Sequence, residues 1–181
     1  CSITGYGQTG PLKDRAGHDI NYLALSGVAD YSRRKGEKPV PQGLQIADIA
    51  GGSHHAVMSV LAAVIERSQT GEGQHLDISM TDCAFSMNAM FAAGMLGGGV
   101  EPQAESTMLN GGSFYDYYET SDGRYMSVGS LEPQFLMQLC DALEIKHLIG
   151  KAGSQKPEDI HEFKQAISDK LKGQSFDYWT D

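Results

Sequence analysis

The spacing of apolar and polar residues predicts alternating strands and helices in the first part of the chain. Residues 2–6 suit a short strand, and the glycine-rich residues 7–17 suit a surface loop. Apolar side chains recur at helical spacing over residues 19–28, and Gly27 is placed to end that helix. Residues 31–43 are polar, basic and proline-bearing, which predicts a loop.

The clearest helix is predicted for residues 50–67, where valine, leucine and isoleucine recur at helical spacing. A glycine stop follows in TGEG, residues 70–73. Residues 74–80 then alternate apolar and polar side chains as a strand does, and Thr81 with Asp82 is suited to cap a further helix. An order of strand, helix, strand and helix is typical of the α/β class.

A glycine-rich stretch over residues 97–107 predicts a linker, and the pattern changes after it. Residues 114–130 are interpreted as two strands joined at an Asp-Gly pair, which is a strong hairpin signal. Helices with proline in the first turn are expected over residues 133–144 and 157–172. The sequence after the linker therefore indicates a separate α+β module.

These patterns predict part of a large α/β domain over residues 1–105 and the start of a small α+β domain over residues 106–181. Both ends of the chain resemble interrupted elements, because CSITGYG suits a strand already under way and SFDYWTD suits a helix just begun. We expect a piece of a longer protein, in which case the absence of a signal peptide says little about its compartment.

Charge and composition bear on the partners of the protein. The chain has 14 Lys+Arg against 23 Asp+Glu, and its formal net charge of -9 would repel a phosphate backbone. No apolar run reaches the ~18–20 residues needed to cross a bilayer. We therefore expect neither nucleic acid nor a membrane as a partner. The three cysteines lie far apart without a CxxC pair, which favours ordinary thiols over a disulfide framework or a zinc site.

Several short motifs match or resemble known functional patterns but lack the sequence context that those functions require. GYGQTG, residues 5–10, matches a dinucleotide-binding fingerprint, but proline and charged residues follow where an apolar helix should begin. A glycine-rich surface turn is the better interpretation. His54 and His55 are adjacent on a predicted helix, where successive side chains diverge by roughly 100° and do not easily chelate one ion. HExxH and G-x-S-x-G motifs are absent, and no metal is expected.

Four carboxylates and one histidine remain as candidates for chemistry. The carboxylates are Asp19, Asp48, Asp82 and Glu132. Asp48 precedes the clearest helix, where the helix dipole favours an ionised carboxylate, and an N-cap is its simpler interpretation. Capping is likewise the simpler interpretation of Glu132. His18 lies at a loop-to-helix junction, where a lone histidine is more often structural, although imidazole exchanges protons readily near neutral pH.

Five segments together resemble the family III CoA-transferase (CaiB/BaiF) superfamily, and within it the α-methylacyl-CoA racemases. In chain order they are GYGQTGP (5–11), RAGHDINYLALSGV (15–28), ADIAGG (47–52), ERSQTGEGQHLDISM (66–80) and MLNGGSFYDYYETSDGRYMSVGSLEPQF (108–135). Residues 82–107 and 145–181 resemble the family only loosely. The resemblance implies part of a Rossmann-like large domain that binds CoA and carries the catalytic residues, followed by a smaller α+β domain, in an interlocked dimer.

The resemblance also implies an activity and its residues. It indicates an isomerase of fatty acid metabolism, a racemase that inverts the α-carbon of 2-methyl-branched acyl-CoA thioesters. His18 and Asp48 become the two acid/base residues of a 1,1-proton transfer through an enolate, and Glu132 becomes the hydrogen-bond partner of the histidine across the subunit interface. Asp19 corresponds to a residue whose backbone N–H holds the thioester oxygen. Tyr22 corresponds to a residue that lines the acyl-CoA pocket.

The same resemblance sets the expected partners and leaves two alternatives open. No cofactor is expected, because coenzyme A is part of the substrate, and a homodimer is expected. In the CoA transferases of this superfamily the aspartate at the position of Asp48 is a nucleophile, whereas the histidine of GHDINY is generally replaced. The second alternative is a catalytically inactive dimerisation piece. The expected location is cytoplasmic in a bacterium, and mitochondrial or peroxisomal in a eukaryote.

Overall fold

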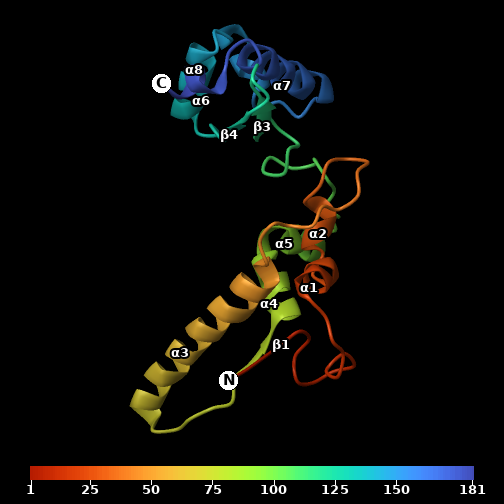
Figure 1. Ribbon diagram of the computed structural model, residues 1–181, viewed down its shortest axis with the longest axis vertical. Helices are drawn as coiled ribbons and strands as arrows, with labels where there is room; N and C mark the ends of the chain where they lie inside the picture. The colour runs from red at the N-terminus through yellow and green to blue at the C-terminus, as the bar shows by residue number, and fades with distance from the viewer. The chain divides into compact units, whose positions relative to one another are not determined.

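The chain folds into two compact units. The computed structural model describes residues 1–181, and the units comprise Cys1–Gln103 and Ala104–Asp181 (Figure 1). The boundary lies close to the one expected after residue 105. The unit Cys1–Gln103 is called unit 1 below, and the unit Ala104–Asp181 is called unit 2.

Unit 1 contains a parallel pair of strands that are distant in sequence. β1 (Ser2–Thr4) pairs with β2 (Asp77–Ser79), and Ile3 lies opposite Ile78. Parallel neighbours require a long crossover between them. The crossover here contains α1 (Asp19–Leu25), α2 (Val28–Tyr31), the π-helix η1 (Ala47–His54) and α3 (His55–Thr70). The predicted α/β class is therefore confirmed, with a smaller sheet than the pattern suggested.

The single helix predicted over residues 19–28 is broken in two. α1 ends at Leu25, and Gly27 has a φ of 82°, a left-handed conformation that glycine adopts without steric cost. The buried Ser26 hydroxyl donates to the carbonyl of Leu23 at 3.0 Å, which satisfies it at the end of α1. The break lets α2 start in a new direction, and both helices contribute to the cavity described below.

The helix predicted after residue 80 is also broken. α4 (Met80–Met87) and α5 (Ala89–Gly98) meet at Asn88. The buried Asn88 side chain accepts a hydrogen bond from the Tyr31 hydroxyl at 2.6 Å and donates to the carbonyl of Ser26 at 3.3 Å. The cap of α4 is Ser79, whose hydroxyl accepts from the backbone N–H of Asp82 at 3.2 Å. The predicted Thr81–Asp82 cap was wrong by a few positions.

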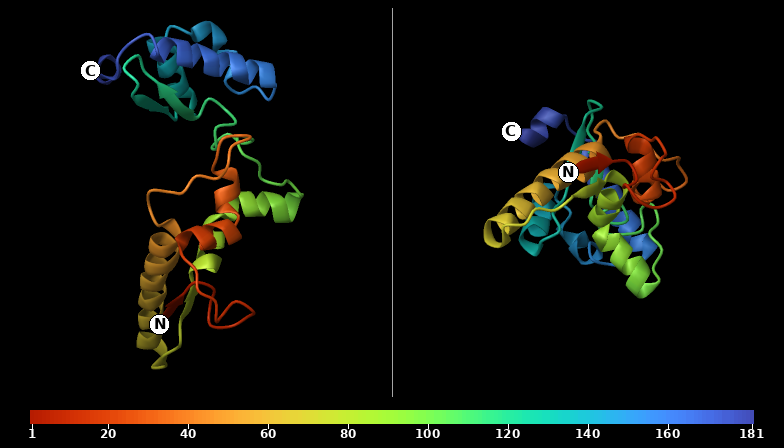
Figure 2. Two further views of the ribbon diagram at one scale, coloured as in Figure 1. Left: turned by 45° about the vertical axis from the view of Figure 1, so that its right-hand side comes forward. Right: turned by 90° about the horizontal axis from the view of Figure 1, so that it is seen from below.

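α3 has the predicted stop but an unexpected environment. It ends at Gly71, whose φ is 79°. Its apolar side chains are largely exposed: Val57 is 59%, Leu61 is 58% and Ile65 is 61% exposed. Figures 1 and 2 agree that only the first turns of α3 lie against other helices of unit 1. The helical spacing of apolar residues thus predicted the helix, but it did not predict that these residues are exposed in unit 1.

η1 and α3 run on without interruption as one helix of 24 residues, Ala47–Thr70. By length and composition alone this helix is long and apolar enough to cross a membrane. The expectation concerned only uninterrupted apolar runs and did not identify this segment, because the helix begins before residue 50, ends after residue 67 and includes polar residues. The absence of a membrane partner stays a prediction.

Unit 2 has the predicted hairpin and helices. β3 (Asp116–Glu119) pairs antiparallel with β4 (Tyr125–Val128), and Gly123 between them has a φ of 77°. The helical elements are α6 (Pro133–Ala142), the 3-10 helix η2 (Lys146–Lys151), α7 (Pro157–Leu171) and α8 (Phe176–Thr180). The core gathers around the fully buried Phe163 and Ile167 of α7, and the Phe163 ring meets that of Phe114 edge-on at 5.3 Å.

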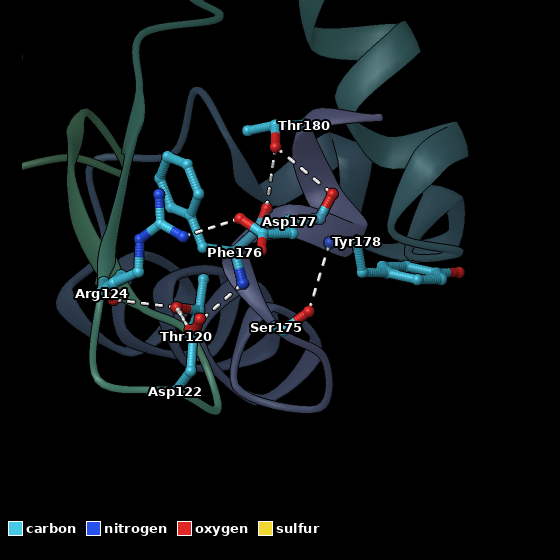
Figure 3. Close-up of polar contacts among 8 residues, drawn as sticks. All are labelled: Thr120, Asp122, Arg124, Ser175, Phe176, Asp177, Tyr178 and Thr180. Atoms are coloured by element: carbon cyan, nitrogen blue, oxygen red, sulfur yellow. Dashed lines mark hydrogen bonds and ion pairs between the residues drawn. The ribbon is translucent and has the colours of Figure 1, made fainter.

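The hairpin turn of unit 2 is joined to α8 by a polar cluster (Figure 3). Asp122 accepts a hydrogen bond from the Thr120 hydroxyl at 2.5 Å and another from the Phe176 backbone N–H at 3.2 Å. Arg124 forms an ion pair with Asp177 at 2.7 Å, and its guanidinium lies 3.7 Å from the centre of the Phe176 ring. These contacts therefore join the hairpin turn to α8 and stabilise both.

This cluster predicts a dependence of stability on pH. The Thr120 hydroxyl, more than any other contact, lowers the pKa of the Asp122 carboxyl. A carboxylate whose pKa is lower in the folded chain stabilises it above the unfolded value of about 3.9, and this contribution disappears as the pH falls through the folded pKa. Asp122→Asn keeps an acceptor oxygen but does not titrate. It should lose less stability than the wild type between about pH 5 and about pH 3 in thermal unfolding, and equal losses would contradict the assignment.

Candidate active site

A cavity of about 460 Å³ opens in unit 1 among α1, α2, the loop after α2 and the start of η1. Its volume falls in the range of about 300–1,000 Å³ typical of small-molecule sites. The charged and titratable part of its lining consists of His18, Asp19 and Asp48. Two candidate acid/base residues thirty positions apart in the chain thus line one cavity.

His18 stands directly before α1, and its backbone is held in an extended conformation. The His18 N–H donates to the side-chain oxygen of Asn21 at 3.0 Å, and the His18 carbonyl accepts from the Asn21 N–H at 2.8 Å. These reciprocal bonds fix the N-cap position. The exposed imidazole is therefore carried by a constrained backbone at the edge of the cavity.

Asp19 connects the helix that follows His18 to the helix that carries Asp48. Its half-buried carboxylate accepts hydrogen bonds from the backbone N–H groups of Ala47, at 2.6 Å, and Asp48, at 3.1 Å. Both donors lie at the N-terminus of η1, where N–H groups have no partner within the helix. Asp19 thus caps a helix that begins 28 positions later in the chain.

Asp48 itself is not an N-cap, and that simpler interpretation was wrong. The residue at the N-cap position of η1 is Ile46, and the capping carboxylate is that of Asp19. Asp48 lies in the first turn of η1, is half-buried, and its own carboxylate accepts no hydrogen bond from the protein. The Asp48 carboxylate is therefore available to a molecule in the cavity.

The position of Asp48 also depends on two glycines of η1. A Cβ at Gly51 would lie 3.0 Å from the carbonyl oxygen of Met80, and a Cβ at Gly52 would lie 3.1 Å from the Met80 sulfur. A side chain at either position would therefore press η1 against Met80 of α4, most directly at Gly51, where the neighbour is backbone. π-Helical turns such as η1 occur frequently at functional sites. Sequence periodicity did not reveal the π-helix, and the glycines were noted only as part of ADIAGG.

Tyr22 lies in the core of unit 1 and not on the cavity wall. It is 4% exposed, packs with Leu23 and Ala47, and its ring meets that of Tyr6 edge-on at 5.3 Å. Burial raises the pKa of the Tyr22 phenol, and the neighbouring Tyr6, Asp48 and Asp19 raise it further. The phenol therefore stays protonated near neutral pH. A contact of Tyr22 with substrate stays a prediction.

The other candidates are not among the residues that line this cavity. Glu132, in unit 2, occupies the N-cap position of α6, but its exposed side chain makes no capping hydrogen bond. Its pairing with His18 stays a prediction. Asp82 is exposed in the first turn of α4. His55 has a structural contact, since its Nδ1 lies 2.6 Å from the carbonyl oxygen of Ala50 in η1.

GYGQTG forms a turn, as the surface-loop interpretation predicted. The Gly7 N–H donates to the Thr4 hydroxyl at 2.9 Å, and the Gln8 N–H donates to the Asp77 carboxylate at 2.8 Å. No helix begins until Asp19, so the motif lacks the helix N-terminus on which a dinucleotide-binding fingerprint depends.

The chain is similar to known proteins along its whole length. The sequence profile of CoA-transferase family III matches residues 1–181. Alpha-methylacyl-CoA racemase of Mus musculus is 35% identical over 176 residues, which are 95% of this chain and 46% of that protein. Succinyl-CoA:glutarate CoA-transferase of Homo sapiens is 33% identical over 149 residues, which are 82% of this chain and 34% of that protein.

A solved structure gives the same result for the fold. The crystal structure of a CAIB/BAIF family protein from Brucella suis superimposes with a TM-score of 0.76 at 26% identity, covering 99% of this chain and 48% of that chain. This chain spans less than half the length of the relatives that it matches. Those relatives include both a racemase and a CoA transferase. From the match along its whole length, the chain belongs to CoA-transferase family III.

Proposed function

We propose that the complete protein is an α-methylacyl-CoA racemase, which inverts the α-carbon of 2-methyl-branched acyl-CoA thioesters. The observation that carries the proposal is the shared cavity of His18 and Asp48. An imidazole and a carboxylate without a protein partner are the two groups that a 1,1-proton transfer requires. The 35% identity to a protein named as such a racemase supports the same reaction.

In the proposed reaction, one of the two groups removes the α-proton from one face of the substrate carbon. The other group delivers a proton to the opposite face, so the configuration inverts and no atom is gained or lost. A thioester is needed because its carbonyl delocalises the negative charge of the enolate better than a carboxylate does. The backbone N–H of Asp19, in the first turn of α1, would hold the enolate oxygen and contribute a few kcal/mol, as oxyanion-hole donors do.

The remaining parts of the proposal follow from this chemistry. Coenzyme A activates the substrate and is part of it, so the reaction has no step that calls for a metal or redox cofactor. Glu132 would hydrogen-bond to His18 from the partner subunit of a homodimer. The exposed carboxylate of Glu132, which makes no capping bond, supports that assignment.

CoA transfer is the second candidate, and the same carboxylate favours it. In that reaction Asp48 would attack the thioester carbonyl, form a mixed anhydride and release CoA as the thiolate. The thiolate would attack the Asp48 carbonyl of this anhydride, which releases the donor acid and leaves a CoA thioester on Asp48. The acceptor carboxylate would displace the thiolate from Asp48 to form a second anhydride, and the thiolate would then attack the acceptor carbonyl, which gives the acceptor thioester and regenerates Asp48. The 33% identity to a protein named as a succinyl-CoA:glutarate CoA-transferase supports this candidate. His18 separates the two, because acyl transfer to Asp48 needs no second base.

One assay distinguishes the two reactions. The complete protein is incubated with a single epimer of a 2-methylacyl-CoA in D2O, with and without glutarate as acceptor. We expect deuterium at the α-carbon and epimerisation in both samples. CoA transfer to glutarate without deuterium in the recovered thioester would refute the racemase proposal. Asp82→Asn, which changes an exposed carboxylate away from the cavity, is the matched control and should exchange at the wild-type rate.

A further inference from the structure

The part of the cavity lining that the proposed proton transfer does not use is largely apolar. Apart from the acid/base residues, the wall includes Ile20 and Leu23 of α1, Val28 of α2 and Ile46 before η1. The loop after α2 adds the segment Pro39–Pro41. Apolar walls with a few placed polar groups are typical of sites that bind an apolar ligand. The cavity is therefore suited to an apolar substituent held beside the two bases.

Val40 differs from the rest of this wall because it lies between two prolines, of which the second restricts its backbone. Proline fixes its own φ, and a residue before proline is restricted to extended conformations. Val40 follows Pro39 and precedes Pro41. The side-chain amide of Gln42 also donates to the carbonyl of Val40 at 3.3 Å. The loop therefore presents the Val40 side chain from a restricted backbone.

The Val40 side chain borders open space. It is 61% exposed although it lines the cavity, so it is not packed into the core of unit 1. Leu23, by contrast, is 5% exposed and belongs to that core. Ile20 is also exposed, but it directly follows Asp19, the residue that caps η1. Among the apolar wall residues, Val40 can thus change size with little effect on the core or on the acid/base residues.

We propose that Val40 selects the substrate by size, so that its side chain limits the length and bulk of the acyl chain that the cavity accepts. The proposal rests on the proposed acyl-CoA chemistry and assigns the acyl chain to the apolar wall. A ligand in the cavity would cover Val40 and remove its apolar surface from water, which favours binding of chains that reach it.

The test uses Val40→Phe and Val40→Ala in the complete protein. Two quantities are measured for a short substrate, 2-methylbutanoyl-CoA, and a long one, 2-methyldecanoyl-CoA. These are kcat/KM for α-proton exchange, and the Kd of the corresponding non-reacting CoA thioethers by calorimetry. Val40→Phe should lower the long-to-short ratio of both quantities by about tenfold, the usual scale of size discrimination in an apolar pocket. Val40→Ala should leave that ratio unchanged or raise it.

Val100→Phe is the matched control, because Val100 is 67% exposed and does not line the cavity. It should keep the wild-type ratio. An unchanged long-to-short ratio of Kd in Val40→Phe would overturn the proposal for Val40. Absence of exchange in the wild type with either thioester would instead overturn the racemase proposal, and the Kd ratio of the thioethers would still decide the role of Val40.

Discussion

Replacement of His18 or Asp48 by alanine should stop inversion of the substrate α-carbon while the protein stays folded. Removal of a general acid or base typically lowers a rate by about 10²–10⁴-fold. Each variant removes one of two groups that act on opposite faces of the same carbon, so inversion should fall by at least this factor in both. Conversion of one epimer of the thioester into the other, and circular dichroism of each variant, provide the measurement.

The two variants also separate the racemase from the transferase. A racemase loses inversion in both His18→Ala and Asp48→Ala. A transferase that uses Asp48 as its nucleophile loses activity in Asp48→Ala and keeps it in His18→Ala. Near-normal inversion in either variant would contradict the two-base assignment. Both residues are partly or fully exposed, so neither substitution should lower the unfolding temperature by much.

Asp19→Ala should weaken both the fold and the proposed activity, because the Asp19 carboxylate joins the helix that follows His18 to the helix that carries Asp48. The substitution leaves the N–H groups of Ala47 and Asp48 without their acceptor. Loss of a helix cap with charged hydrogen bonds costs about 2 kcal/mol. A displacement of about 1 Å at Asp48 would also lower the exchange rate about 100-fold. Chemical denaturation and the D2O assay measure the two effects separately.

Two further variants serve as controls for Asp19. Asp19→Asn keeps an oxygen acceptor and should recover most of the stability. Asp30→Ala removes an exposed carboxylate that forms a surface ion pair with Arg33, and such pairs contribute at most about 1 kcal/mol. If Asp19→Ala were no less stable than Asp30→Ala, the capping role of Asp19 would be wrong.

The elements that the sequence predicted well are those determined by neighbouring residues. The hairpin of unit 2 turns at Gly123, which has a positive φ, so the Asp-Gly signal was sufficient. α7 begins at Pro157, a residue suited to the first turn, and Gly173 follows shortly after its end. Local propensity fixes features of this kind, and tertiary contacts did not override it.

Contacts between distant residues account for what the sequence did not predict. Asn88 interrupts a helix because its buried amide bonds to Tyr31 and Ser26, and a linear pattern does not contain that information. The close approach of η1 to α4 at Gly51 depends on the backbone of Met80. The periodicity of α3 identified a helix, yet its apolar residues are exposed in unit 1.

The site was only partly accessible from the residues alone. Local context favoured capping for Asp48 and a structural role for His18, and only the family resemblance joined them. The structure brings both to one cavity, which spacing in the sequence did not predict. It also gives Asp19 a structural role through its carboxylate, whereas the resemblance had pointed to its backbone N–H. The catalytic roles of these residues stay predictions.

The bond between Asp19 and the start of η1 also bears on how relatives of this protein diverge. These hydrogen bonds join the start of α1 to the start of η1, and the loop with Val40 lies between these two points in the chain. Doubling the length of a flexible loop adds only about 0.6 kcal/mol of closure entropy. We therefore expect insertions and deletions in residues 33–45 to be tolerated without moving His18 and Asp48 apart. Under the proposed function, such changes would alter the substrate preference and leave His18 and Asp48 at the same cavity.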